Sequence, residues 1–298
     1  MKAIQTNNHD KIELTQPYKL LFEELSKDFY CKWNVFGFFI KEINHPKNQI
    51  NVILRIDVDS GFHLCPCLAT LLKEKGIMNA SFYFLTFTNR YYNIWESNIP
   101  KIIHEKGFEV GLHSDHYYEE LISGKNALSG ITHDVKKLSN VIGSPIKGMV
   151  YHGHPAIDAF NTTNWEAYKN VPPKELGLKY HDGLNSPYTN PLSTKIWRPN
   201  TIKPILSDYI GVNGAWLYYP NYPLKILKKL TPGESIHIII HPINAFKWWK
   251  NWDYSYGEVT PKKVTLNQKL LALYKMRTPK VLQYIINKYL PIRGDIHG

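Results

Sequence analysis

Asn51-Val-Ile-Leu-Arg-Ile-Asp57-Val-Asp59-Ser-Gly61 begins as an apolar run with β-branched residues, which predicts a buried β-strand. The segment ends in two aspartates one residue apart, and Pro66 soon afterwards is typical of the first turn of a helix. Two carboxylates at the end of a buried strand cost free energy unless a cation or hydrogen bonds compensate them. The alternatives are therefore a pair of acids that serves a cation and a pair that caps the next helix.

Strand and helix patterns alternate after this segment, which predicts parallel strands with helices packed outside them. Polar residues suited to chemistry recur at one position, the carboxyl end of each predicted strand. They are Asp57, Asp59, His113, His152, Asp182 and His241. In an α/β barrel these strand ends converge on one mouth, where active sites are built. We therefore expect an α/β barrel over residues 51–260 with one site at its mouth.

The composition is that of a globular protein, with 298 residues, 43% of them hydrophobic and 20% charged. Cys31, Cys65 and Cys67 are too few for a disulfide framework, and we interpret them as free thiols. The N-terminus lacks the apolar core of a signal peptide and no apolar run is long enough to span a membrane, so we expect a cytoplasmic protein. The net charge of +11 suggests an anionic partner.

Two extensions flank the predicted barrel. Residues 1–50 are expected to pack on it, with an amphipathic helix near residues 16–29. Residues 261–298 form a basic helical tail, which either packs on its own domain or contacts an anionic membrane surface and makes the protein membrane-peripheral. The aromatic stretch 246–256 either covers the rim of the domain or stacks on a sugar or base. The positive charge concentrates in the tail and no nucleic-acid-binding motif is visible, so we expect no nucleic-acid partner.

His113 and His116 are three residues apart, a spacing that places two imidazoles on one side of a helical turn. With Asp59 they make a two-histidine, one-carboxylate set, which binds a divalent metal and leaves coordination positions open. Asp57, beside the ligand carboxylate, is placed to take a proton from water, and His241 to protonate a leaving nitrogen. Together these residues predict metal-assisted hydrolysis of an amide.

The chain resembles the polysaccharide deacetylase family, also called the NodB-homology or carbohydrate esterase 4 family, over about residues 50–245. Five segments look like the family's five motifs in order. They are Ile56-Asp57-Val58-Asp59, Gly107-Phe-Glu-Val-Gly-Leu-His113-Ser114, Val150-Tyr-His152-Gly-His154-Pro155, Leu178-Lys-Tyr-His-Asp182 and Ile240-His241-Pro242. The resemblance implies a distorted (β/α) barrel of the NodB type, a zinc-type divalent metal, and removal of an N-acyl group, usually acetyl, from a sugar or sugar conjugate. It assigns metal binding to Asp59 and base work to Asp57.

The motifs also depart from the family pattern. Val58 separates the two aspartates, and Tyr117 stands where the family has its second histidine, with His116 one place earlier. His152 and His154 replace the family's arginine in the third motif. We assign metal binding to Asp59, His113 and His116, with the third ligand open among His116, His152 and Asp115. Substrate binding or support of the ligands is assigned to Asp115, His152, His154 and Asp182.

These departures keep two other functions open. One is a non-catalytic NodB-like protein that binds a sugar or serves as a scaffold. The other is an amidase that acts on a non-sugar amide. For the hydrolase, a cytoplasmic address and a basic surface suggest a nucleotide-linked or lipid-diphosphate-linked sugar in the biosynthesis of a cell-surface polysaccharide.

Overall fold

The computed structural model describes residues 13–27, 33–36, 48–59, 61–86, 94–153, 164–182, 206–208 and 220–246. Its centre is a parallel sheet with the strand order β6-β5-β4-β3-β2-β8-β7, and β1 pairs with β2 beside this path. The strands are β1 (Trp33–Phe36), β2 (Ile50–Val58), β3 (Ser81–Leu85), β4 (Glu109–Ser114), β5 (Gly148–Tyr151), β6 (Tyr180–His181), β7 (Leu206–Ser207) and β8 (Ser235–Ile240). The predicted α/β class with parallel strands is confirmed.

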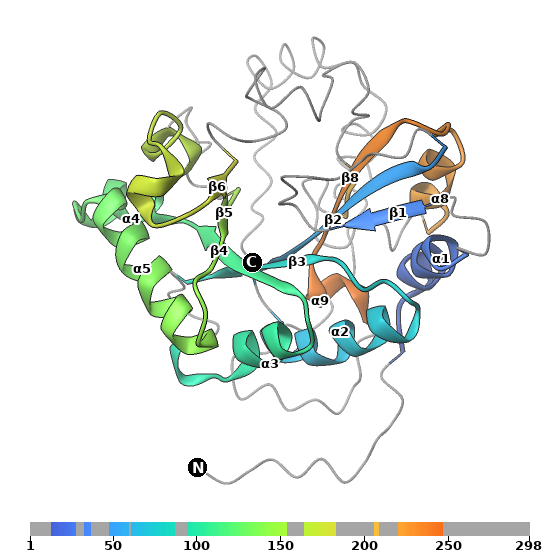
Figure 1. Ribbon diagram of the computed structural model, residues 1–298, viewed down its shortest axis with the longest axis horizontal. Helices are drawn as coiled ribbons and strands as arrows, with labels where there is room; N and C mark the ends of the chain where they lie inside the picture. The colour runs from blue at the N-terminus through green and yellow to red at the C-terminus, as the bar shows by residue number, and fades with distance from the viewer. Residues whose placement is uncertain are drawn as a thin grey trace, which may run out of the picture.

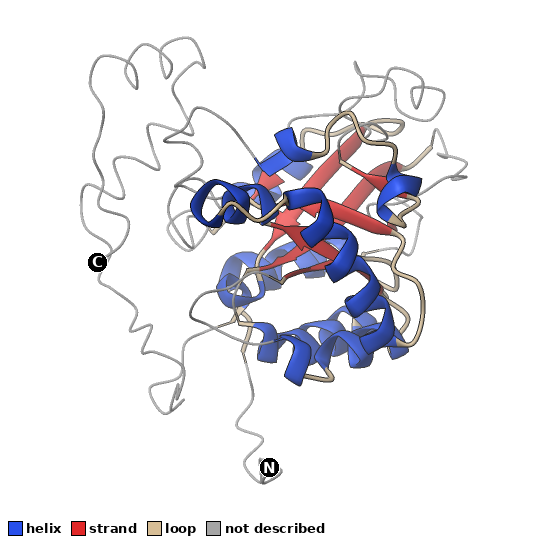
Figure 2. Cartoon of the chain, turned by 90° about the vertical axis from the view of Figure 1, so that its left-hand side faces the viewer, coloured by secondary structure: helices blue, strands red, loops and turns tan. Residues whose placement is uncertain are grey.

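The sheet curls into a half-barrel, and the helices lie around its outside (Figure 1). Among the described residues, β6 and β7 end the sheet at its two edges and do not pair with each other. The predicted distorted barrel is thus present as an open, curved sheet. Figure 2 shows the strands from a second side, with helices packed against them.

β2 is the central strand, and all nine of its residues are buried. It pairs with β8 along one edge, where Asn51 lies opposite Ser235, and with β3 along the other, where Arg55 lies opposite Ser81. A strand buried on both faces needs a nearly continuous apolar run, which explains the composition of residues 52–56. β1 pairs with the first half of β2, so part of the N-terminal extension belongs to the sheet.

The helices are α1 (Gln16–Leu25), α2 (Cys65–Glu74), α3 (Ile99–Glu105), α4 (His116–Ser123), α5 (Ala127–Ile142), α8 (Tyr222–Leu227) and α9 (Pro242–Ala245). The longest, α5, begins at Asn126, whose side chain accepts a hydrogen bond from the amide of Ser129 at 2.9 Å. It ends at Gly143, which has a φ of 73° and closes the helix in the left-handed region. Its apolar face packs into the core through Ile131, Val135, Leu138 and Ile142.

Some elements differ from the sequence predictions. From the sequence, residues 176–180 are typical of a short strand, but a 3-10 helix, Pro173–Leu176, takes the start of this segment and only Tyr180–His181 pair as β6. The many Pro, Asn and Tyr residues of 199–223 favour irregular structure, yet this segment contains β7 and the start of α8. The aromatic residues beyond Phe246, the tail 261–298 and His154 lie outside the described residues. Within the part that the structure describes, no helix has the length and apolar character needed to cross a membrane.

Candidate metal centre and active site

The site lies where the parallel strands end, because their carboxyl ends meet at one edge of the curved sheet. Arg55, Asp57 and Asp59 alternate along β2 and the residue after it, so their side chains leave on the same side. His113 comes from β4, and His241 directly follows β8. The convergence of these strand ends, predicted from the sequence, brings Asp57, Asp59, His113, His152 and His241 together.

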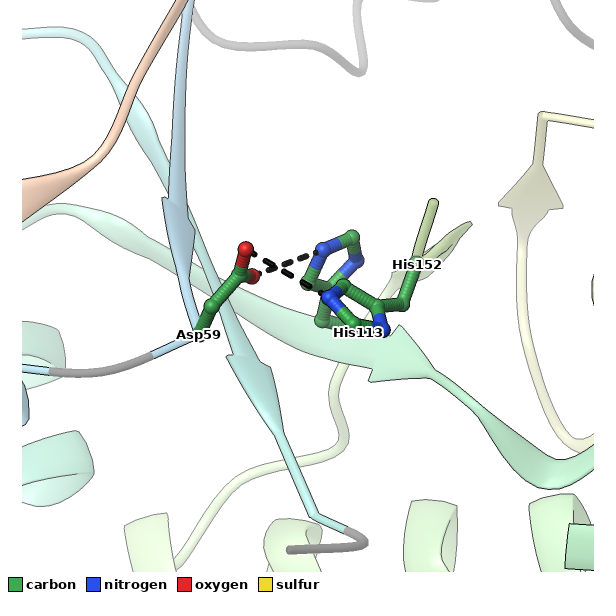
Figure 3. Close-up of side chains that lie close together, drawn as sticks. All are labelled: Asp59, His113 and His152. Carbon is green, nitrogen blue, oxygen red and sulfur yellow. Dashed lines mark ion pairs between the residues drawn. The ribbon is translucent and has the colours of Figure 1, made fainter. Parts of the chain in front are cut away.

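Asp59, His113 and His152 form a compact group of three side chains (Figure 3). One ligand atom from each lies within 4.8 Å of the others. The Nε2 of His113 is 3.1 Å from Oδ1 of Asp59, and the Nε2 of His152 is 3.4 Å from Oδ2 of the same carboxylate. Two imidazole nitrogens and a carboxylate oxygen are a common donor set for zinc and similar divalent ions.

The surroundings of this group fit a cation. Oδ1 of Asp59 is buried, and among the described residues its neighbour is the Nε2 of His113 at 3.1 Å, with no hydrogen bond to any other group. A cation held between this oxygen and the imidazole would compensate the buried carboxylate. Burial raises the pKa of Asp59, but His152, His241 and His113 outweigh burial and hold it well below its usual value, so the carboxylate is ionised. The Nδ1 of His113 lies 3.4 Å from the carbonyl oxygen of Val150, which leaves Nε2 for a metal.

Asp115 and Asn164 hold His152 in place through its Nδ1 and its backbone carbonyl oxygen. Oδ1 of Asp115 lies 3.4 Å from the Nδ1 of His152, and the Asn164 side-chain amide donates to that same oxygen at 2.5 Å. The Asn164 amide also donates to the carbonyl oxygen of His152 at 2.8 Å. Burial lowers the pKa of His152, but Asp59 and Asp115 outweigh it and raise the pKa to about 10. Asn164 lies outside the sequence motifs, so no sequence pattern indicated that it supports the site.

His116, expected as a metal ligand, is placed elsewhere. Its Nε2 lies 3.1 Å from Oδ2 of Asp134 on α5, and its Nδ1 lies 3.0 Å from the Ser114 hydroxyl. Its ring packs so closely on α5 that a Cβ at Gly130 would lie 2.7 Å from it. The expectation assumed one helical turn through His113 and His116, whereas His113 ends a strand and His116 begins α4. Of the three candidates for the third ligand, the structure brings His152 to the group.

Asp57 makes a two-point ion pair with Arg55. Oδ1 of Asp57 is 2.6 Å from Nε of Arg55, and Oδ2 is 2.7 Å from Nη2. Both residues are buried, and Oδ2 of Asp57 is also 3.6 Å from the Nε2 of His113. Arg55 donates a further hydrogen bond to the carbonyl oxygen of Tyr151 at 3.3 Å. The sequence analysis did not single out Arg55, although its position two residues before Asp57 placed it on the same side of the strand.

His241 pairs with Asp208. Its Nδ1 lies 2.5 Å from Oδ1 of Asp208, and its backbone amide donates to Oδ2 at 2.8 Å. Its Nε2 faces Asp59, 3.3 Å from Oδ2. Burial lowers the pKa of His241, but the Asp208 and Asp59 carboxylates outweigh it and raise the pKa well above 6.5. This favours the protonated imidazole, as a general acid requires.

Asp182, assigned from the sequence to substrate binding or support of the ligands, bonds to the chain beside the site. Its carboxylate accepts the Tyr168 hydroxyl at 2.8 Å and the backbone amide of Tyr151 at 2.9 Å. It therefore fixes the end of β5 just before His152. The acid that pairs with His241 is Asp208, which the sequence analysis missed because β7 is too short to give a strand pattern.

Comparisons with known proteins give similarity at the level of solved structures. No protein-family model and no curated protein sequence matches the chain. A CE4 family pseudoenzyme mutant with restored enzymatic activity shows 14% identity and a TM-score of 0.37, covering 67% of this chain and 58% of its own. The polysaccharide deacetylase Bc1974 from Bacillus cereus shows 14% identity and a TM-score of 0.37, covering 64% of this chain and 79% of its own.

A third solved structure is the Xyl-CE4 domain of a multidomain xylanase from the hindgut metagenome of Trinervitermes trinervoides. It shows 14% identity and a TM-score of 0.34, covering 80% of this chain and 83% of its own. We draw no activity from similarities of this size.

Proposed function

We propose that this protein is a metal-dependent amide hydrolase that removes an N-acyl group, acetyl by resemblance to the polysaccharide deacetylases, from a sugar. One observation carries the proposal: the group Asp59, His113 and His152 is flanked by an ion-paired carboxylate, Asp57, and by a carboxylate-paired imidazole, His241. A metal set with a base and an acid beside it is the constellation that amide hydrolysis needs.

Asp59, His113 and His152 would hold the metal, and their donor atoms suit zinc or a similar divalent ion. When bound, such an ion lowers the pKa of water and polarises a carbonyl. The Asp59 side chain is 29% exposed, so the group is open to solvent on one side and a substrate can reach it.

Asp57 would accept the proton that the attacking water releases, because it is a carboxylate beside the metal group. Its Oδ2 lies 3.6 Å from the Nε2 of the proposed ligand His113. Arg55 holds both of its oxygens and so fixes which lone pairs face the site. The C–N bond of the amide then breaks, and the nitrogen takes a proton before it leaves. His241 would supply that proton from Nε2, while its Nδ1 stays bonded to Asp208. The products are a carboxylic acid and a free amine.

The proposal that the substrate is a sugar rests on the sequence motifs. Residues 107–114 and 150–155 in particular resemble motifs of polysaccharide deacetylases. We further propose, from the net charge of +11, that the substrate is a nucleotide-linked or lipid-diphosphate-linked sugar used in the biosynthesis of a surface polysaccharide.

The test combines metal analysis with acetate release. Protein purified without added metal should contain about one divalent ion per chain, and it should release acetate from an N-acetylated sugar or its nucleotide conjugate. Release from an acylated non-sugar amide alone would make the protein a general amidase. Stoichiometric metal without hydrolysis, or no metal at all, would support a binding or scaffold protein and overturn the proposal. His241→Ala should keep the metal and lose turnover by about 100-fold or more.

A further inference from the structure

The N-terminal segment before α1 is bonded to the segment that follows His241. Leu14 forms an antiparallel bridge with Phe246, and the amide of Thr15 donates to the carbonyl oxygen of Ala245 at 2.8 Å. The Thr15 hydroxyl donates to the carbonyl oxygen of Asn244 at 3.2 Å. These contacts join positions about 230 residues apart in the sequence, and they lie three to five residues beyond His241.

The first turn of α1 then reaches the partner of His241. The Tyr18 hydroxyl donates a hydrogen bond to Oδ2 of Asp208. Both side chains are fully buried, and Tyr18 also packs edge-on against Phe22, with ring centroids 6.2 Å apart. Burial and the neighbouring Asp208 carboxylate raise the pKa of Tyr18 well above 10, so its hydroxyl remains a donor at neutral pH.

Asp208 receives donors on both of its oxygens. Oδ2 accepts from Tyr18, from the backbone amide of His241 at 2.8 Å and from the side-chain amide of Asn244 at 3.3 Å. Oδ1 meets the Nδ1 of His241 at 2.5 Å. Because three donors hold Oδ2, the carboxylate cannot turn freely, and Oδ1 is kept on the imidazole. The imidazole is thereby oriented with Nε2 toward Asp59.

We propose that Tyr18, on the N-terminal helix, is a positioning residue for His241 and acts through Asp208. Its role in catalysis rests on the proposed function, in which His241 protonates the leaving nitrogen. The N-terminal extension would then contribute to catalysis, because its Tyr18 keeps the His241 ring in position. The orientation of the His241 ring is a structural consequence that does not depend on which reaction the site carries out.

The activity test compares substrates that differ in their need for an acid. An amide has a poor leaving group that must be protonated, whereas 4-nitrophenyl acetate releases an anion that needs no proton. Tyr18→Phe in the full chain should lower kcat on the N-acetylated sugar by roughly tenfold, the usual scale for loss of a supporting hydrogen bond at a site. KM, metal content and turnover of the ester should change by less than about twofold.

Tyr180→Phe is the matched control. It also removes a buried hydroxyl from a carboxylate, since Tyr180 donates to Oε1 of Glu109 at 2.5 Å, but at the amino-terminal end of the sheet. An equal loss on amide and ester, or the same amide loss in Tyr180→Phe, would show that Tyr18 serves stability alone and would overturn the proposal. Unchanged amide turnover in Tyr18→Phe would overturn it as well.

A second readout needs no substrate, so it separates failure of this proposal from failure of the proposed function. In the nuclear magnetic resonance spectrum of histidine rings, the Nδ1 proton of His241, assigned through its absence in His241→Gln, should be shifted downfield by its carboxylate partner. Tyr18→Phe should move or broaden this signal, and Tyr180→Phe should leave it in place. An Nδ1 signal that is the same in Tyr18→Phe and in the parent would refute the positioning role even if the chain hydrolyses no amide.

Discussion

Arg55 and Asp57 stand two residues apart on β2 and meet through two parallel contacts, at 2.6 and 2.7 Å. A strand places alternate residues on one side, so the pair is built into the local geometry of a single strand. Both residues are buried, and Arg55 is 7% exposed. The carboxylate proposed as the base is thus held by its own strand, with no need for a residue from another motif.

Substitution of Arg55 by lysine should separate charge from geometry. Lysine keeps the positive charge, but its ammonium cannot form the two-point contact, so we expect kcat on an N-acetylated sugar to fall by roughly 10-fold to 100-fold while bound metal stays stoichiometric. Arg55→Met should cost more stability, about 3–5 kcal/mol, because it leaves the buried Asp57 carboxylate without its guanidinium partner. Kinetics, metal content and urea unfolding of both variants check this. Wild-type kcat in Arg55→Lys would show that the two-point contact has no part in catalysis.

The two aspartates should respond differently to loss of charge. Asp59→Asn replaces a charged oxygen ligand by a neutral amide, and we expect it to lose the metal. Asp57→Asn should retain the metal and lose turnover, because an amide cannot accept the proton of water. Metal content and hydrolysis rate are measured for both variants, purified side by side. Metal-free Asp57→Asn together with metal-bound Asp59→Asn would reverse the two roles.

Two histidines can be compared in the same way. His152→Gln removes a donor atom from the proposed metal group and should reduce bound metal strongly. His116→Gln removes the contact to Asp134, which holds α4 on α5, and the contact to Ser114 at the end of β4, and it should lower stability while metal content stays unchanged. Dialysis against a weak chelator followed by metal analysis distinguishes the two. If His116→Gln loses the ion and His152→Gln keeps it, the side chains rearrange on metal binding and the group described here is not the binding set.

Much of the fold and part of the site follow from local patterns. The apolar run of β2, the alternation of strand and helix patterns and the recurrence of polar residues at strand ends were enough to predict parallel strands and a shared site. These features depend on residues close in sequence, which is why they can be recognised without coordinates. Arg55 was equally accessible, since alternation along the strand fixed its side.

The residues that could not be predicted depend on contacts between distant segments. Spacing alone favoured His116 over His152 as a ligand, because the change from strand to helix between His113 and His116 leaves no mark in a three-residue interval. Asp208 sits after a two-residue strand, and only the pairing of β7 with β8 brings it to His241. Tyr18 lies outside every motif, and its contact with Asp208 spans 190 residues.

A buried histidine away from the metal group predicts how stability depends on pH. His237 on β8 is fully buried, and burial, with the nearby Arg55 charge, holds its pKa well below 6.5. In the unfolded chain His237 binds a proton near pH 6.5, whereas in the folded chain it stays neutral at that pH. Acidification below pH 6.5 therefore favours unfolding. One such group lowers the free energy of unfolding by at most about 1.4 kcal/mol for each pH unit of acidification.

The comparison with His237→Gln isolates this contribution. Other histidines of the chain titrate over the same pH range, so the total curve mixes several contributions to stability. The difference between parent and variant cancels them. Urea unfolding at pH 8.0 and 5.5 should show the parent losing about 1 kcal/mol more than His237→Gln over this interval. His133→Gln, which removes an exposed histidine from α5, is the control. A parent and a His237→Gln variant that lose the same stability on acidification would mean that His237 takes up its proton without unfolding.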